Sequence, residues 1–294
     1  MVRLRRHPSN PILKPKAEHP WEERAVFNAA AADKDGKVHI VYRAVDRDYV
    51  SRLGLALSPD GYTVSERLPQ PIYEPQDPSE SRGVEDPRIT CLDGRYYMLY
   101  TAYDGHMYCV AMAESDDLVH WQRRGIVLPD MLNKDAALFP RKIDGSFCMV
   151  HRLAPNMWLA WSDDCYHWYR MEILAQPRPG TWDSVRIGLS GPPIHTPEGW
   201  VVLYHGVDAQ GVYRQGIMLL DLDDPRRVVR RQDEPILEPE TDYELHGDVP
   251  NVVFSCGHVV RDDTLIIYYG GADTVIGIAT CPMGEILDWA RGKN

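Results

Sequence analysis

One short pattern recurs five times along the chain and constrains its fold more than any other feature. Each copy begins with a turn that contains one or two acidic residues, in four cases followed by glycine, and continues into β-branched and aromatic residues. Such a turn is typical of a hairpin that leads into a strand. The copies begin at Asp35, Asp93, Asp144, Glu198 and Asp262, at spacings of 58, 51, 54 and 64 residues.

Further strand-like stretches lie before and after each turn. Those before it are residues 25–32, 84–90, 136–143, 191–196 and 249–256, and those after it are 52–58, 108–115, 157–162, 215–220 and 275–281. Helical character is confined to a possible turn at residues 283–290. Three- or four-stranded repeats of this length are typical of a β-propeller, whereas a β-sandwich does not repeat so regularly. We therefore predict an all-β fold, a single five-bladed propeller domain over residues 1–294 with the active site at its central channel.

The composition narrows the class of protein. The chain has 294 residues and a formal net charge of −11, which argues against nucleic acid or an anionic membrane as the main partner. No apolar run is long enough to span a membrane, and residues 1–8 lack the apolar core of a signal peptide. The six cysteines form no CxxC pair, so we expect reduced thiols and a cytoplasmic location. The histidines show no metal-binding spacing, and we expect no metal site.

Polar residues stand where several of the predicted strands end. Arg43, Arg152 and His205 follow the second strands of their repeats, and Asn28 and Asp86 lie in first strands. In a propeller these strand ends converge on the central channel. Buried charges are costly unless they are paired. The side chains therefore form either ion pairs between blades or a polar funnel for a ligand with hydroxyl groups and negative charge.

The segment at residues 83–89 contains the candidate catalytic acid, Asp86. Pro87 fixes its own φ and is expected to push Asp86 towards an extended conformation. In a crowded polar pocket we expect the pKa of Asp86 to be raised, so that it can donate a proton near neutral pH. The alternative is an ordinary Asp-Pro turn at the surface.

A surplus of cations accompanies this single carboxylate. An inverting glycosidase uses a pair of carboxylates, whereas here one good candidate stands with Lys134, Arg152, Arg186 and His205. Arginine and lysine clusters bind phosphate. The chain contains neither a P-loop nor a GxGxxG motif, so a nucleotide phosphate is not expected. A carboxylic acid opposite inorganic phosphate suggests phosphorolysis, in which phosphate replaces water as the nucleophile at a sugar.

Taken together, the motifs of the chain resemble those of glycoside hydrolase family 130, from about Asn10 to Thr280. They are FNAA at 27–30, YRA at 42–44, EDPR at 85–88, NKDAALFP at 133–140, HR at 151–152, RIG at 186–188, GPP at 191–193, LYHGV at 203–207, VPNVVF at 249–254 and YGGAD at 269–273. The family comprises β-mannoside phosphorylases and some β-mannosidases on a five-bladed propeller. The resemblance therefore implies the same fold and substrate class for this chain.

The resemblance also implies roles for individual residues. Asp86 matches the general acid, which protonates the leaving oxygen through the mannose 3-hydroxyl. Phosphate ligands are implied at Lys134, Arg152, Arg186 and His205, although Arg186 stands where many members have lysine. The implied substrate-binding residues are Asn28, Arg43 and Asp273 around the mannose ring, Arg88 in the same motif as Asp86, and Tyr103, Tyr213 and Phe254 as walls of the sugar subsites.

From this resemblance we predict an inverting phosphorylase that converts a β-mannoside and phosphate into α-mannose 1-phosphate and a shortened acceptor. Inorganic phosphate is the expected co-substrate, with no metal or organic cofactor, and a homo-oligomer is possible. The alternatives are a β-mannosidase that uses water, or a glycan-binding propeller without activity. The linkage, β-1,2 or β-1,4, is left open, although the opening segment 10–28 is more similar to members that act on β-1,2-mannosides.

Overall fold

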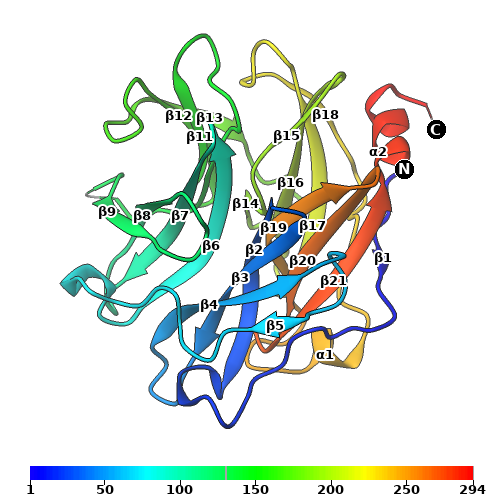
Figure 1. Cartoon of the computed structure of the whole chain (residues 1–294). Helices are drawn as coiled ribbons and strands as arrows, with labels where there is room; N and C mark the ends of the chain where they lie inside the picture. Colours follow the sequence, from blue (N-terminus) through cyan, green and yellow to red (C-terminus); the bar gives the residue numbers. More distant parts are fainter. Residues whose placement is uncertain (130, 294) are drawn as a thin grey trace.

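The computed structural model describes residues 1–129 and 131–293, and strands dominate them. They form five antiparallel units in chain order (Figure 1). The first unit consists of β2 (Ala25–Lys34), β3 (Lys37–Val45), β4 (Ser51–Ser58) and β5 (Glu66–Arg67). The second consists of β6 (Gly83–Leu92), β7 (Arg95–Tyr103), β8 (Tyr108–Ser115) and β9 (Gln122–Ile126). One parallel pairing, between Ser51 and Gly83, joins these two units into one sheet.

The other three units are separate sheets. The third consists of β10 (Lys134–Leu138), β11 (Phe147–Leu153), β12 (Asn156–Ser162) and β13 (Tyr169–Ala175). The fourth consists of β14 (Arg186–Leu189), β15 (Ile194–Thr196), β16 (Gly199–Val207), β17 (Tyr213–Leu220) and β18 (Val228–Arg231). The fifth consists of β19 (Val253–Arg261), β20 (Thr264–Gly271), β21 (Val275–Pro282) and, from the other end of the chain, β1 (Arg5–Arg6).

Helices are short. Within the described residues they are α1 (Asp242–Leu245), α2 (Met283–Ala290) and the 3-10 turns η1 (Pro20–Glu22) and η2 (Pro78–Glu80). Helix α2 confirms the turn expected at 283–290. Neither α-helix of the described chain has the length and apolar character that crossing a membrane requires.

The acidic turns are confirmed as hairpin turns. Asp35-Gly36, Asp93-Gly94 and Asp144-Gly145 have positive φ at both residues, as a type I′ turn requires. The turn Asp262-Asp263 adopts the same conformation without glycine, at φ angles of 46° and 55°. These turns therefore set the register of the hairpins, as the repeat predicted.

Three of the predicted first strands are misplaced. That of the fifth unit was expected at residues 249–256, but β19 covers Val253–Arg261. Residues 191–196 were expected to be the first strand of the fourth unit, but only Ile194–Thr196 is a strand, and β14 at Arg186–Leu189 takes that place. Pro192 and Pro193 cannot donate to a strand ladder, which separates β14 from β15. In the third unit the strand ends at Leu138 instead of residue 143, shortly before Pro140.

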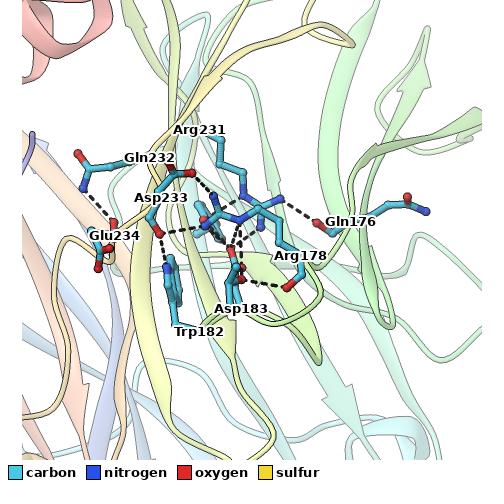
Figure 2. A network of polar contacts seen from close by, with 10 residues as sticks. Gln176, Arg178, Trp182, Asp183, Arg231, Gln232, Asp233 and Glu234 are labelled. Carbon is cyan, nitrogen blue, oxygen red and sulfur yellow. Dashed lines mark hydrogen bonds and ion pairs between the residues drawn. The ribbon is translucent and has the colours of Figure 1, made fainter.

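A buried carboxylate links side chains around the fourth unit (Figure 2). Asp183 accepts a hydrogen bond from the Tyr204 hydroxyl at 2.9 Å and pairs with Arg231 at 2.6 Å and Arg178 at 3.0 Å. Asp183 is fully buried. The Thr181 hydroxyl also donates to Asp183. Because a buried carboxylate is tolerated only when paired, Asp183 depends on these partners.

The same tyrosine–carboxylate–arginine triad recurs in three other units. Its members are Tyr42, Glu22 and Arg67 in the first unit, Tyr100, Glu80 and Arg123 in the second, and Tyr269, Glu244 and Arg6 in the fifth. The third unit has His151 at the tyrosine position, hydrogen-bonded to Asn133. Each triad ties a second strand to a segment from outside its own hairpin.

We predict that Asp183→Asn destabilises the protein by about 3 kcal/mol, because two arginines lose the charge that compensates them. Chemical denaturation measures this change. Asp233→Asn is the control: Asp233 pairs with the same Arg178, but its side chain is 98% exposed. We expect its effect to stay within about 0.5 kcal/mol. Equal effects of the two substitutions would contradict this account of the triad.

Candidate active site

One cavity, of about 160 Å³, gathers most of the residues that the sequence singled out. Eight of the twelve line it: Asn28, Arg43, Asp86, Lys134, Arg152, Tyr213, Phe254 and Asp273. Three more touch the lining. Arg186 donates a hydrogen bond to the Tyr213 hydroxyl, His205 lies 4.5 Å from Phe254 between ring centroids, and Arg88 lies 5.8 Å from the Phe254 ring.

Tyr103 is the one candidate outside this group. It ends strand β7, where it pairs with Tyr108 and Gly83, and it does not line the cavity among the residues that the structure describes. Its role as a wall of a sugar subsite stays a prediction.

In three neighbouring units, a backbone bulge orients one short polar side chain towards the cavity. The ladders are interrupted at Asn28 in β2, Asp86 in β6 and Asp135 in β10, with φ angles of 48°, 52° and 55°. The extended conformation expected for Asp86 is therefore wrong, because the bulge places it in the left-handed region. Bulges re-aim a side chain without ending a strand, and they often lie beside active sites.

Asp86 is almost completely buried, with 4% of its surface exposed. One carboxylate oxygen accepts hydrogen bonds from Asn28 at 2.9 Å and from Arg43 at 3.2 Å. Burial acts to raise the pKa of Asp86, but Arg43 and then Lys134 outweigh it and hold the pKa below its ordinary value. The expected upward shift is therefore wrong, and Asp86 is ionised near neutral pH.

Asp273 behaves in the opposite way. Its pKa is raised to about 7, chiefly by burial and also by Asp86 and Asp248, and Arg43 offsets only part of this rise. Two carboxyl groups in one cavity therefore differ in protonation near neutral pH: Asp86 is ionised and Asp273 is about half protonated. Such a separation is typical of sites that carry out acid–base chemistry.

Asp135 was missed as a site residue, because the bulge that orients its side chain is not visible in the sequence. It occupies in the third unit the place that Asn28 and Asp86 occupy in the first and second. Its carboxylate lies 2.9 Å from Arg152, 3.3 Å from Arg88 and 3.6 Å from His205. Burial acts to raise its pKa, but Arg152 and then Arg88 lower it well below the ordinary range.

His205 does not belong to the cations. Its side chain is fully buried, and burial lowers its pKa to about 3, while Asp135 offsets only part of that shift. The expected positive charge is therefore wrong. Arg152 donates to Nε2 at 3.4 Å, so the neutral ring carries its proton on Nδ1, which has no hydrogen-bond partner among the described residues.

Two positively charged side chains at the cavity, Lys134 and Arg186, have no close ion-pair partner among the described residues. The Lys134 ammonium is 3.9 Å from Glu85, whose carboxylate pairs more closely with Arg43 at 2.6 Å. Arg186 has no carboxylate partner within 4.0 Å in the described chain and lies over the Tyr213 ring. Glu85 was also missed by the sequence analysis.

The charges around the cavity do not balance. The positive side chains are Arg43, Arg88, Lys134, Arg152 and Arg186, and the ionised carboxylates that face them are Glu85, Asp86 and Asp135. Asp273 also lines the cavity and is about half ionised near neutral pH, so the described part of the chain has an excess of one to two positive charges there. The described residues contain no group of three or more histidine, cysteine or acidic side chains placed to hold a metal ion. The arrangement suits a doubly charged anion next to a polar ligand.

Comparison with known proteins identifies the family. A family model described as beta-1,4-mannooligosaccharide phosphorylase, that of glycoside hydrolase family 130, matches residues 3–292. A 1,2-beta-oligomannan phosphorylase of Thermoanaerobacter sp. (strain X514) is 49% identical over 97% of this chain and 99% of its own length. A beta-1,2-mannobiose phosphorylase of the same strain is 48% identical over 95% and 97%. The chain therefore belongs to glycoside hydrolase family 130.

Solved structures agree with this assignment. The beta-1,2-mannobiose phosphorylase of Listeria innocua, in complex with beta-1,2-mannobiose, superposes with a TM-score of 0.89 at 28% identity, over 98% of this chain and 99% of that one. A structure from work on family hydrolases that target beta-1,2 mannosidic linkages in Candida mannan gives 0.90 at 30% identity, over 95% and 93%.

The raised pKa of Asp273 predicts a pH-dependent stability. Between about pH 4 and pH 7 the unfolded chain ionises this group before the folded protein does, so the folded state loses up to about 4 kcal/mol there. Asp273→Asn removes this loss. We expect the stability of the variant relative to the wild type to rise over this range and level off above it. Melting temperatures measured from pH 4 to pH 8 test this, and a constant difference would contradict it.

Proposed function

We propose that this protein is an inverting phosphorylase that acts on β-linked mannosides. The observation that carries the proposal is the excess of one to two positive charges beside Asp86, in a cavity also lined by the neutral polar group Asn28. A phosphate dianion matches this excess, whereas water does not need it. The activities described for the two Thermoanaerobacter relatives support the same conclusion.

The two reactants take different sides of the cavity. Phosphate binds to Lys134, Arg152 and Arg186, with His205 as a neutral hydrogen-bonding group. The terminal mannose binds between Asn28, Arg43 and Asp273, and Phe254 and Tyr213 form an aromatic wall. Beneath them, Asp135 and Arg88 hold one another and orient Arg152.

In the reaction, a phosphate oxygen attacks C1 of the mannose from the face opposite the glycosidic bond. The bond from C1 to the leaving oxygen breaks, that oxygen receives a proton supplied by Asp86, and α-mannose 1-phosphate forms. Arg43, Lys134 and Arg88 surround Asp86 and keep it ionised before phosphate binds. The entry of a dianion among these cations raises the pKa of Asp86, so Asp86 takes up a proton from solvent when phosphate binds and then supplies it to the leaving oxygen.

A second candidate function is hydrolysis. Asp86 and Asp273 line one cavity and differ in protonation near pH 7. An acid and a base in one site are what an inverting hydrolase requires. The family also contains hydrolases that target beta-1,2 mannosidic linkages.

We further propose that the linkage is β-1,2 and that the units are five blades of one propeller domain. Both Thermoanaerobacter relatives are described as acting on β-1,2-linked mannans or mannobiose.

The contacts between units support the propeller. They run from β2 to β6, from β6 to β10, from β10 to β14, from β17 to β19 and from β19 back to β2. Strand β1 pairs with β21 and so joins the start of the chain to the fifth unit. The proposal has phosphate as the only co-substrate and is compatible with a homo-oligomer, and the six cysteines, which form no CxxC pair, favour a cytoplasmic location.

Phosphate dependence tests the proposed reaction. We expect β-1,2-mannobiose to be consumed only when phosphate is present, with mannose 1-phosphate as a product. Arg186→Ala should raise the KM for phosphate at least about tenfold, because a charged hydrogen bond is lost, and leave the KM for mannobiose within about twofold. Arg227→Ala, at a side chain 70% exposed in an ion pair with Asp221, is the control. Undiminished release of mannose without phosphate would establish the hydrolase instead.

A further inference from the structure

In the loop between β3 and β4, a tyrosine has a backbone conformation that glycine adopts more readily than other residues. Tyr49 has a φ of 59°, in the left-handed region that side chains rarely adopt. The loop is fixed by Asp46, which accepts hydrogen bonds from the backbone of Asp48 at 3.0 Å and Val50 at 2.9 Å and pairs with Arg52 at 2.6 Å. The strained conformation is therefore imposed by an ordered turn.

The fourth unit contains the same turn with glycine. In the loop between β16 and β17, Asp208 accepts from the backbone of Gln210 at 2.9 Å and Val212 at 3.0 Å, and pairs with Arg214 at 2.6 Å. Gly211, with a φ of 78°, stands where the first unit has Tyr49. The turn thus forms without an aromatic side chain, and folding does not explain the tyrosine. Strain of this kind is often kept for function.

The side chain of Tyr49 lies beside Asp248, at the edge of the cavity wall that we call the rim. The Arg24 guanidinium is 3.8 Å from the ring centroid and pairs with Asp248 at 2.7 Å, and the Tyr49 hydroxyl is 3.5 Å from Asp248. Asp248 directly precedes Val249, which lines the cavity. Tyr49 is 48% exposed, so a ring that Arg24 covers on one side still presents surface to a ligand.

The direction from which phosphate attacks the sugar places the leaving group at this rim. In an inverting displacement the nucleophile and the leaving group lie on opposite faces of the sugar. Lys134, Arg152 and Arg186 come from the third and fourth units, whereas Tyr49 and Asp248 come from the first unit and from the segment before the fifth. The departing sugar therefore leaves towards the side that carries Tyr49.

We propose that Tyr49 is a stacking platform for the pyranose ring on the leaving-group side, and so helps determine which acceptor the enzyme uses. The inference rests on the proposed phosphorolysis. Sugar rings present a face of C–H groups that packs on an aromatic ring, and tyrosine adds a polar edge. Arg24 fixes the ring from one side, and Asp248 offers a carboxylate for the hydroxyl groups of the same sugar.

Tyr49→Gly tests the proposal, because glycine suits the turn and the fourth unit shows that the turn forms with it. The reaction is run in reverse, with mannose 1-phosphate as donor and mannose or β-1,2-mannobiose as acceptor. We expect the KM for the acceptor to rise about tenfold, while the KM for mannose 1-phosphate stays within about twofold. The melting temperature should change by no more than about 3 °C. Tyr49→Phe should retain most of the acceptor affinity.

Tyr169→Ala, at a tyrosine 43% exposed on β13, is the control for loss of an exposed ring and should match the wild type. An unchanged acceptor KM in Tyr49→Gly, or a variant that fails to fold, would overturn the proposal. Wild-type protein without phosphate-dependent turnover would instead refute the proposed function. In that case calorimetric titration with β-1,2-mannobiose still decides the role of Tyr49: equal affinities of wild type and Tyr49→Gly would exclude the platform.

Discussion

Paired charge at the centre of the molecule is the constraint on which the site depends. Asp86, Arg88 and Asp135 are each at most 4% exposed, and charged groups tolerate such burial only with partners. The contact between Arg88 and Asp135 joins the second unit to the third, and Arg88 also donates to the backbone of Leu189 and Ser190 in and after β14. The interactions that hold neighbouring units together are therefore the same ones that position the cations. The cations left over are available to a ligand.

Strand alternation separates structural from functional side chains. In a strand, neighbouring residues point to opposite faces. Tyr42 and Tyr204 supply hydroxyls to buried triads, and the residues that follow them, Arg43 and His205, face the site. A tyrosine held in this way fixes the position of the next side chain without contacting the ligand. This explains why polar pairs recur at the ends of the second strands.

The sequence predicted features that depend on local residues. The hairpin turns and the antiparallel repeat follow from patterns a few residues long, and the eight residues of the cavity lining were named from strand ends or from the family resemblance that short motifs carry. What failed depends on residues far apart in the chain. Asp86 was expected to have a raised pKa, but Arg43 and Lys134 lower it, and each lies more than 40 residues away in the sequence. His205 was counted as a cation because its complete burial is not visible in a sequence. Asp135 was overlooked although it repeats the position of Asp86, because the register of the bulges is a property of the folded strands.

The central claim is that phosphate, held by the surplus cations, attacks the sugar on the face opposite the bond that Asp86 helps to break. Following the first minutes of the reaction of β-1,2-mannobiose with phosphate by ³¹P and ¹H NMR tests this most directly, because the anomeric configuration of the first product reports the geometry of attack. The account predicts that mannose 1-phosphate appears as the α anomer alone. Initial formation of β-mannose 1-phosphate, or of free mannose as the only new product, would contradict it.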